Sequence, residues 1–226
     1  MTAPIPPVSK GQRYSRAEWL SDAMVHVAGL SLVLMAVPVL IVVTAMQRGD
    51  LAAVSGVSIY GAALFAMLFC SALYNIGARF RWGAAREWLL KRLDHSAIYI
   101  KIAGTYTPFT LLSGQGIGLT LGLWGAALAG VLLKLVSPYR FRWLALGLYL
   151  AMGWAGVVAG QELLASLPLP VVVLMAVGGA LYTGGVVFYL WERLPYHNTI
   201  WHVFVLAASL VFYAAVMVYV LIGSIG

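Results

Sequence analysis

The stretch TIWHVFVLAASLVFYAAVMVYVLIG, residues 199–223, contains no Asp, Glu, Lys or Arg. A helix needs about 20 predominantly apolar residues to cross the hydrocarbon core of a bilayer. Residues 199–223 are therefore long enough to form a membrane-spanning helix. Six further stretches meet the same requirement, roughly 24–46, 51–75, 94–113, 116–136, 143–160 and 169–190. The fold prediction that follows is an all-α membrane protein with a bundle of seven transmembrane helices.

The composition supports this class and excludes an ordinary soluble domain. Of the 226 residues, 62% are hydrophobic and 9% are charged, and the mean hydropathy is +0.93. A soluble domain carries about 25% charged residues. The only cysteine, Cys70, lies inside an apolar stretch, so the chain has no disulfide framework. We expect residues 1–20 to form an N-terminal tail and residues 21–226 to form one transmembrane domain.

The positions of the basic residues predict the orientation of the bundle. Except for Arg48 and Lys101, every Lys and Arg lies before the first span, at the end of the fourth span (Lys134) or in the segments after the second, fourth and sixth spans. Positively charged segments stay in the cytoplasm. The N-terminus is therefore expected in the cytoplasm and the C-terminus outside. The same clustering between spans explains the net charge of +7 without nucleic acid as a partner, and it leaves membrane lipids as the expected partners.

Ionisable residues inside membrane spans are functional candidates by default. With the predicted orientation, His26, Asn75, Asp94 and His202 all fall in the cytoplasmic third of the bundle, on four different helices. Scattered structural polar residues need not agree in depth, although residues at helix ends can also be simply interfacial. Asp22 lies four residues before His26, so the two share a helix face, and we interpret that pair as structural.

The segment HNTIWH, residues 197–202, does not contain a regular pair of metal ligands. Residues four apart share a face of a helix, whereas residues five apart point in different directions. Asn198 therefore shares a face with His202, and His197 does not. His197 could approach a common metal ion only if the helix began after it or unwound locally.

The chain resembles the hemolysin III proteins of bacteria, which are related to the adiponectin and progestin receptor (PAQR) family. Four segments carry the resemblance: EWLSDAMVHVAG (18–29), SALYN (71–75), KRLDHSAIYIKIAGTYTP (91–108) and IWHVFVLAAS (200–209). The resemblance covers nearly the whole chain. It implies seven helices with the N-terminus inside and a multi-pass protein of the bacterial inner membrane.

The resemblance also implies a zinc ion near the cytoplasmic face. The family pattern has a histidine that ends a Ser-x-x-x-His motif, two histidines four residues apart in the last helix, and an aspartate that holds a water molecule. Ser71, Asp94 and His202 match this pattern, and the resemblance gives Ser71 and Asp94 catalytic positions. The other two ligand positions hold Asn75 and Asn198. Amide oxygens are poor zinc ligands beside imidazole, so weak zinc binding or none is expected.

Lys101 lies seven residues after Asp94, on nearly the same helix face and about 10 Å along the axis. Lysine stems lean toward the helix N-terminus. One hypothesis is that Lys101 replaces the charge of the metal and keeps Asp94 ionised. The alternative is a lysine that faces a water-filled cavity. His95, next to Asp94, points off that face and is expected to be interfacial.

Three function classes follow from these residues and the resemblance. The first is a hemolysin III type membrane protein that acts in membrane-lipid homeostasis or sensing, with a degenerate metal site. The second is a zinc-dependent hydrolase of lipid amides or esters, similar to ceramidases. The third is a pore-forming cytolysin, which the family name suggests, but no helix shows a continuous polar stripe in its sequence.

Overall fold

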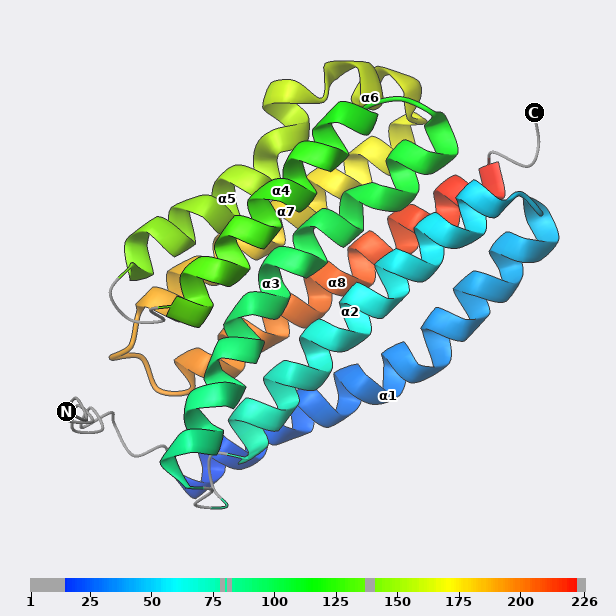
Figure 1. The fold of residues 1–226 in the computed structure, drawn as a ribbon. Coiled ribbons are helices and arrows are strands. Elements are labelled where there is room, and N and C mark those ends of the chain that lie inside the picture. The colour runs from blue at the N-terminus through cyan, green and yellow to red at the C-terminus, as the bar shows by residue number, and fades with distance from the viewer. Residues whose placement is uncertain (1–14, 78–79, 81–82, 137–140, 223–226) are drawn as a thin grey trace.

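The computed structural model describes residues 15–77, 80, 83–136 and 141–222. The helices that it contains form one bundle in which consecutive long helices run in opposite directions (Figure 1). They are α1 (Arg16–Gln47), α2 (Leu51–Gly77), α3 (Ala84–Ser113), α4 (Ile117–Val136), α5 (Arg142–Ala159), α6 (Gln161–Ser166), α7 (Leu169–Leu190) and α8 (His197–Ile222).

The long helices agree with the seven predicted stretches, with two additions. α3 begins at Ala84, well before the predicted start at residue 94, because residues 84–93 contain strong helix formers such as Ala, Leu, Arg and Lys. The short helix α6 was not predicted. It connects α5 to α7 and packs against α3, and its six residues are too few to give a periodic signal in the sequence.

α1 also begins earlier than its predicted span. The side chain of Ser15 accepts a hydrogen bond from the backbone N–H of Glu18, and the Glu18 carboxylate accepts one from the backbone N–H of Ser15. This capping box satisfies two amides that would otherwise lack partners. Residues 16–20, which we assigned to the tail, are therefore helical, and residues 1–14 lie outside the described residues.

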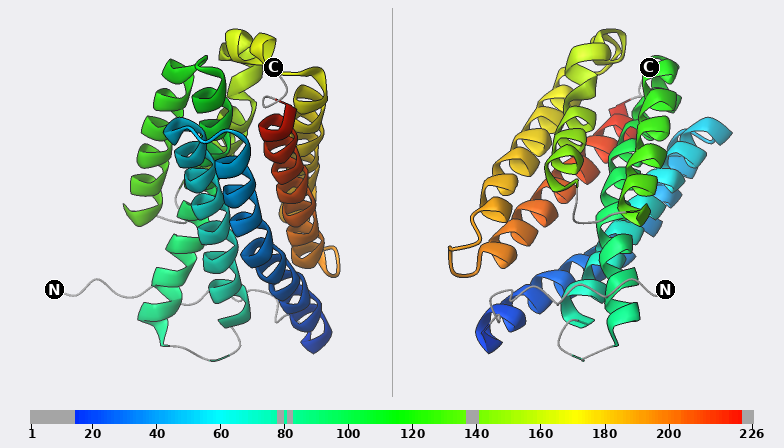
Figure 2. Two further views of the ribbon diagram at one scale, coloured as in Figure 1. Left: turned by 90° about the vertical axis from the view of Figure 1, so that its right-hand side faces the viewer. Right: turned by 60° about the vertical axis from the view of Figure 1, so that its left-hand side comes forward.

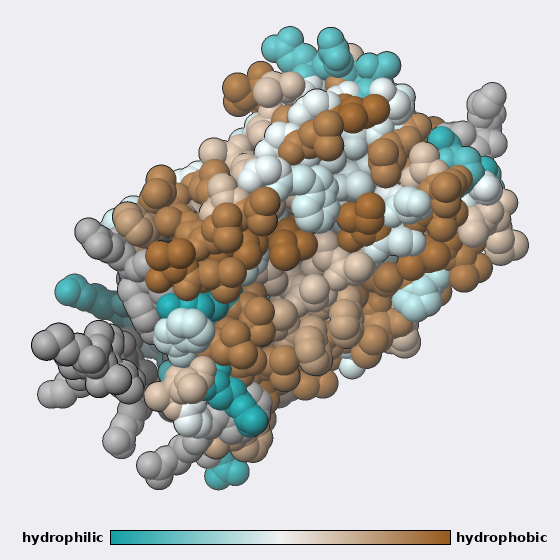
Figure 3. Space-filling model, in the orientation of Figure 1, coloured by the Kyte–Doolittle hydropathy of each residue, from teal (hydrophilic) through white to brown (hydrophobic). Residues whose placement is uncertain are grey.

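Six of the described helices are long and apolar enough to cross a membrane: α1, α2, α4, α5, α7 and α8. Many large apolar side chains on them face outward, for example Met24, Leu34 and Val158 at 65%, 59% and 80% exposure. Apolar residues cover much of the surface in Figure 3, with hydrophilic residues toward the ends of the bundle. These features show an integral, multi-pass membrane protein.

α3 is the most polar of the long helices and lies inside the bundle. It packs along α2 and α4 and also contacts α5, α6 and α8. Its buried residues include Arg92, Lys101 and Thr105, which lower its hydropathy below that of the six apolar helices. The seven-span count and the orientation of the termini stay predictions.

The starts of α1, α3 and α8 lie together at one end of the bundle, called the N-terminal end below (Figure 2). α2 and α4 finish at this end and α5 begins there. Its described basic residues are Arg16, Arg86, Lys91, Arg92, Lys134, Arg142 and Arg193; Lys10, Arg13, Arg79, Arg81 and Arg140 lie outside the described residues. The fold thus brings the candidate polar residues of the first, second, third and seventh predicted spans to one end of the bundle. They are His26, Asn75, Asp94 and His202.

Candidate functional site

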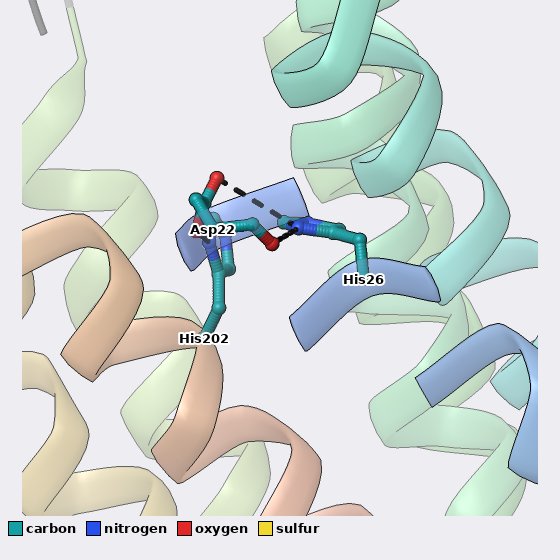
Figure 4. Close-up of side chains that lie close together, drawn as sticks. All are labelled: Asp22, His26 and His202. Carbon is teal, nitrogen blue, oxygen red and sulfur yellow. Dashed lines mark hydrogen bonds and ion pairs between the residues drawn. The ribbon is translucent and has the colours of Figure 1, made fainter. Parts of the chain in front are cut away.

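Two histidines and an aspartate meet between α1 and α8 at the N-terminal end. The Asp22 Oδ1 atom lies 2.6 Å from the His202 Nδ1 atom, and Asp22 Oδ2 lies 3.7 Å from His26 Nδ1. The rings of His26 and His202 meet edge to face, with 4.4 Å between their centroids. Figure 4 shows the α8 histidine pointing at the two α1 side chains. We call Asp22, His26 and His202 the His–Asp cluster.

The His–Asp cluster is buried and is held by its own helices. Asp22, His26 and His202 are 7%, 4% and 9% exposed. His26 Nδ1 lies 2.8 Å from the backbone oxygen of Asp22, one helical turn earlier. The spacing of four residues on α1 places both side chains on the face that α8 covers, so the local sequence positions two of the three groups.

Three further polar side chains surround the cluster. Ser71 of α2 places its hydroxyl 3.2 Å from His26 Nε2. The Asn75 amide donates to the hydroxyl and the backbone oxygen of Ser71, at 3.3 and 3.0 Å. The Asn198 amide nitrogen lies 3.4 Å from Asp22 Oδ2 and 3.4 Å from the Asn75 side-chain oxygen. The cluster and these three residues form what we call the polar network.

Asp94 of α3 reaches the polar network from a third side. Its carboxyl group interacts with the hydroxyl of Ser71 and lies within electrostatic range of His202 and Asp22. The structure therefore brings together Ser71, Asp94 and His202, the three residues that match the family pattern. It also places Asn75 and Asn198 beside them.

A large cavity opens from this end into the bundle. Its volume is about 1120 Å³, and its walls are mostly apolar. The polar network and Asp94 line one part of it, and Lys101, Tyr182 and Phe212 line another. Lys101 therefore faces a cavity, as the alternative to pairing with Asp94 predicted.

The proposed pair between Lys101 and Asp94 is not formed. The Lys101 ammonium lies over the rings of Tyr182 and Phe212, 4.2 and 4.8 Å from their centroids. Among the described residues, no carboxylate lies within ion-pair distance of it. Two helical turns separate the residues by about 10 Å, and the stem of Lys101 turns to the aromatic rings instead of closing that distance.

The two remaining histidines lie in the cavity wall but outside the cluster. α8 begins at His197, so His197 is already part of the helix and is not among the three grouped ligands. The late helix start that would have turned it toward His202 is not seen. The backbone oxygen of His95 accepts a hydrogen bond from the Tyr149 hydroxyl at 2.8 Å.

The ligand set that the resemblance implies does not fit zinc in this chain. The amides of Asn75 and Asn198 are hydrogen-bonded to each other and to Ser71 or Asp22. Among the residues at the three family ligand positions, His202 alone offers an imidazole. A zinc site with three protein ligands cannot be built from one imidazole and two occupied amides.

Asp22 and His26, which we interpreted from the sequence as a structural pair, lie in the candidate site with His202. Two features of the sequence pointed to this: Asp22 and His26 share a helix face, and their predicted depth in the membrane is the same as that of His202. What the sequence did not contain was the contact between α1 and α8, because about 180 residues separate the partners. Only the closed bundle puts Asp22 against His202.

Proteins of one family are similar to this chain over most of its length. A sequence profile described as "Haemolysin-III related" matches residues 16–213. Hemolysin-3 of Bacillus cereus is 36% identical over 208 residues, covering 90% of this chain and 92% of that protein. The Hemolysin-3 homolog of Bacillus subtilis (strain 168) is 35% identical over 207 residues, covering 89% and 94%.

A more distant relative is the human monocyte to macrophage differentiation factor. It is 27% identical over 169 residues, which cover 71% of this chain and 68% of that protein. No solved structure matches the chain. The profile match and the two Bacillus proteins each cover most of the chain. This protein therefore belongs to the haemolysin III-related family.

Proposed function

We propose that this protein binds an anionic single-chain amphiphile inside its bundle and acts in membrane-lipid sensing or homeostasis in a bacterial inner membrane. The observation that carries the proposal is the cavity of about 1120 Å³ with apolar walls and Lys101 inside it. Small-molecule sites are typically apolar cavities of about 300–1,000 Å³ with a few polar groups that orient the ligand. The cavity is large enough for a lipid chain.

Lys101 is the feature that selects an anionic head group. Lys101 is 3% exposed, and in the described part of the chain its ammonium has aromatic faces, not a carboxylate, as neighbours. A buried ammonium without an anion is costly in a membrane protein. A ligand carboxylate or phosphate at this position would supply the missing charge, and the apolar walls would contact the hydrocarbon chain.

Binding of oleate and of oleyl alcohol to the purified protein in detergent tests this proposal. The wild type should prefer oleate by about tenfold or more, since hydrogen bonds to charged groups contribute about 1.5–3 kcal/mol. In Lys101→Met the preference should disappear, because the variant keeps the stem length and loses the charge. A preference that survives in Lys101→Met would contradict the role of Lys101.

The same variant addresses the alternative pairing with Asp94. If Lys101 formed a buried ion pair, removing it would leave an uncompensated carboxylate and destabilise the bundle by about 3–5 kcal/mol. We expect no fall in the melting temperature of Lys101→Met in detergent. A large fall would favour the pairing hypothesis over ligand binding.

Hydrolysis of a lipid amide or ester is the second candidate function. It is favoured by the convergence of Ser71, Asp94 and His202 on the cavity and by the 3.2 Å distance between Ser71 Oγ and His26 Nε2. Release of fatty acid from a short-chain ceramide tests it. Activity that is lost in both Ser71→Ala and Asp94→Asn would support an enzyme, and no release by the wild type would leave the binding function alone.

Pore formation is the third class, suggested by the printed name of the Bacillus relatives. Conductance of planar bilayers that contain the purified protein tests it. We expect none, because in the proposed function the cavity holds an apolar chain and does not conduct water.

A further inference from the structure

The His–Asp cluster has the composition of a metal site. Among the described residues, Asp22, His26 and His202 are the group of histidine and carboxylate side chains whose ligand atoms all lie within 4.8 Å of one another. All three side chains are buried inside the bundle. Two imidazoles and one carboxylate are a familiar ligand set of zinc sites that keep a fourth position for water.

The positions of these atoms are close to those that a tetrahedral ion needs. Zinc bonds of about 2.0–2.2 Å to nitrogen and oxygen place neighbouring ligand atoms about 3.4 Å apart. The distance from His26 Nδ1 to Asp22 Oδ2 is 3.7 Å, and that from His202 Nδ1 to the other carboxylate oxygen, Oδ1, is 2.6 Å. The second distance must widen, since it is now a hydrogen bond between His202 and Asp22. His26 Nδ1 must also release the backbone oxygen of Asp22, which lies 2.8 Å away. A metal ion would take the place of the protons in these two hydrogen bonds, and all three ligand atoms already lie within 4.8 Å of one another.

The residues around the cluster would hold such ligands in place. The Asn198 amide is directed at Asp22 Oδ2, and the Ser71 hydroxyl at His26 Nε2. Hydrogen bonds of this kind orient metal ligands, and losing them costs metal affinity. Asn75 and Asn198 are poor replacements for histidine as ligands. In this structure they support the His–Asp cluster instead, Asn198 through Asp22 and Asn75 through Ser71.

We propose that Asp22, His26 and His202 form a Zn²⁺ site that is displaced toward α1 from the positions implied by the family pattern. The site shares His202 with that pattern. Its other two ligands come from α1, whereas the pattern takes one from the position of Asn75 on α2 and one from the position of Asn198 on α8. It does not depend on the proposed amphiphile, because its atoms belong to the chain alone. It also replaces our expectation, based on the family positions, of weak zinc binding or none.

Zinc content of the full-length protein tests the site. The chain has four histidines, so each can be changed to glutamine in turn. After removal of metal and equilibration with Zn²⁺ alone, the wild type should hold about one Zn²⁺ per chain. His26→Gln and His202→Gln should each lose it, and Asp22→Asn should bind at least about tenfold more weakly.

His95→Gln and His197→Gln are the matched controls, since both residues line the same cavity. Both should retain the ion. The proposal is overturned if the wild type holds no zinc, if His26→Gln still binds it, or if His197→Gln loses it. The Asn75→His/Asn198→His variant has the family ligand types and is the positive control for zinc binding.

A second readout separates loss of a ligand from loss of the fold. Co²⁺ in place of Zn²⁺ reports tetrahedral coordination by visible absorption. The wild type should show this absorption, and His26→Gln should lack it while eluting as a monodisperse species in detergent. If His26→Gln does not fold, Asp22→Asn serves in its place, and unchanged cobalt absorption in a folded Asp22→Asn protein would exclude the carboxylate from the site.

Discussion

At the scale of single residues, buried polar side chains are the main specific contacts between helices. The Tyr106 hydroxyl of α3 donates to the backbone oxygen of Gly153 at 2.7 Å and accepts from the backbone N–H of Gly156 at 3.1 Å. A single hydroxyl therefore joins α3 to α5. In a bilayer, apolar contact alone does not distinguish a neighbouring helix from lipid, so such bonds contribute to the choice of partner.

Tyr106→Phe should lower the free energy of unfolding by about 1 kcal/mol, the typical contribution of a buried hydrogen bond. Equilibrium unfolding in mixed detergent measures the change. Tyr196→Phe is the control, because Tyr196 is 41% exposed and its backbone N–H, not its hydroxyl, donates to Glu18. Equal stability of Tyr106→Phe and wild type would show that lipid or water replaces the bond.

At the scale of helices, glycines decide how closely α3 and its neighbours approach. A Cβ atom added at Gly130 of α4 would lie 2.6 Å from ring atoms of Tyr99 on α3. One at Gly125 of the same helix would meet nothing within 4 Å. Small residues at helix contacts permit close packing of helices in membranes. Gly130 lies at such a contact, with Tyr99 of α3, whereas Gly125 does not.

Gly130→Ala should therefore destabilise the bundle by about 1–3 kcal/mol, because the ring of Tyr99 must move or leave its rotamer. Gly125→Ala should be neutral or slightly stabilising, since alanine is the better helix former. Melting temperatures of the two variants in one detergent make the comparison. Equal effects of the two substitutions would contradict the close contact between α3 and α4.

At the scale of the whole molecule, the path of α3 decides the topology. α3 is buried among other helices and is not one of the six described helices that are long and apolar enough to cross a membrane. If it crosses the membrane, Gly83 before it and Gln115 after it lie on opposite sides. If it does not, the two positions share a side and the bundle has six spans.

Cysteine labelling distinguishes these topologies, with Cys70→Ala as the background. A thiol reagent that cannot cross membranes should label Gln115→Cys on intact cells and should label Gly83→Cys only after the membrane is opened. Glu162→Cys and Arg193→Cys, both at exposed positions, give an independent check. With seven spans and a cytoplasmic N-terminus, Glu162→Cys should be labelled on intact cells and Arg193→Cys only after the membrane is opened, whereas with six spans the two results are exchanged. Labelling of both test positions from outside would exclude seven spans and the cytoplasmic N-terminus together.

The sequence by itself predicted the long helices of this protein, though not the short helix α6, and it singled out most residues of the polar network. Apolar length predicted the six apolar helices, because a bilayer leaves no partner for an open backbone, although α1 begins eight residues before its predicted span. Ser71, Asp94 and His202 were identified from their residue types, their depth and the family resemblance. The shared face of Asp22 and His26 was also visible, since it depends only on helical spacing.

The tertiary structure decided which of these residues meet. Asp22 contacts His202 across the closed bundle, and no local pattern encodes a contact between the first and the last helix. The direction of Lys101 was likewise undetermined, because two turns of one helix permit a reach toward Asp94 or toward Tyr182 and Phe212. The helices follow from short-range physics along the chain, whereas the site depends on packing between segments that are distant in sequence.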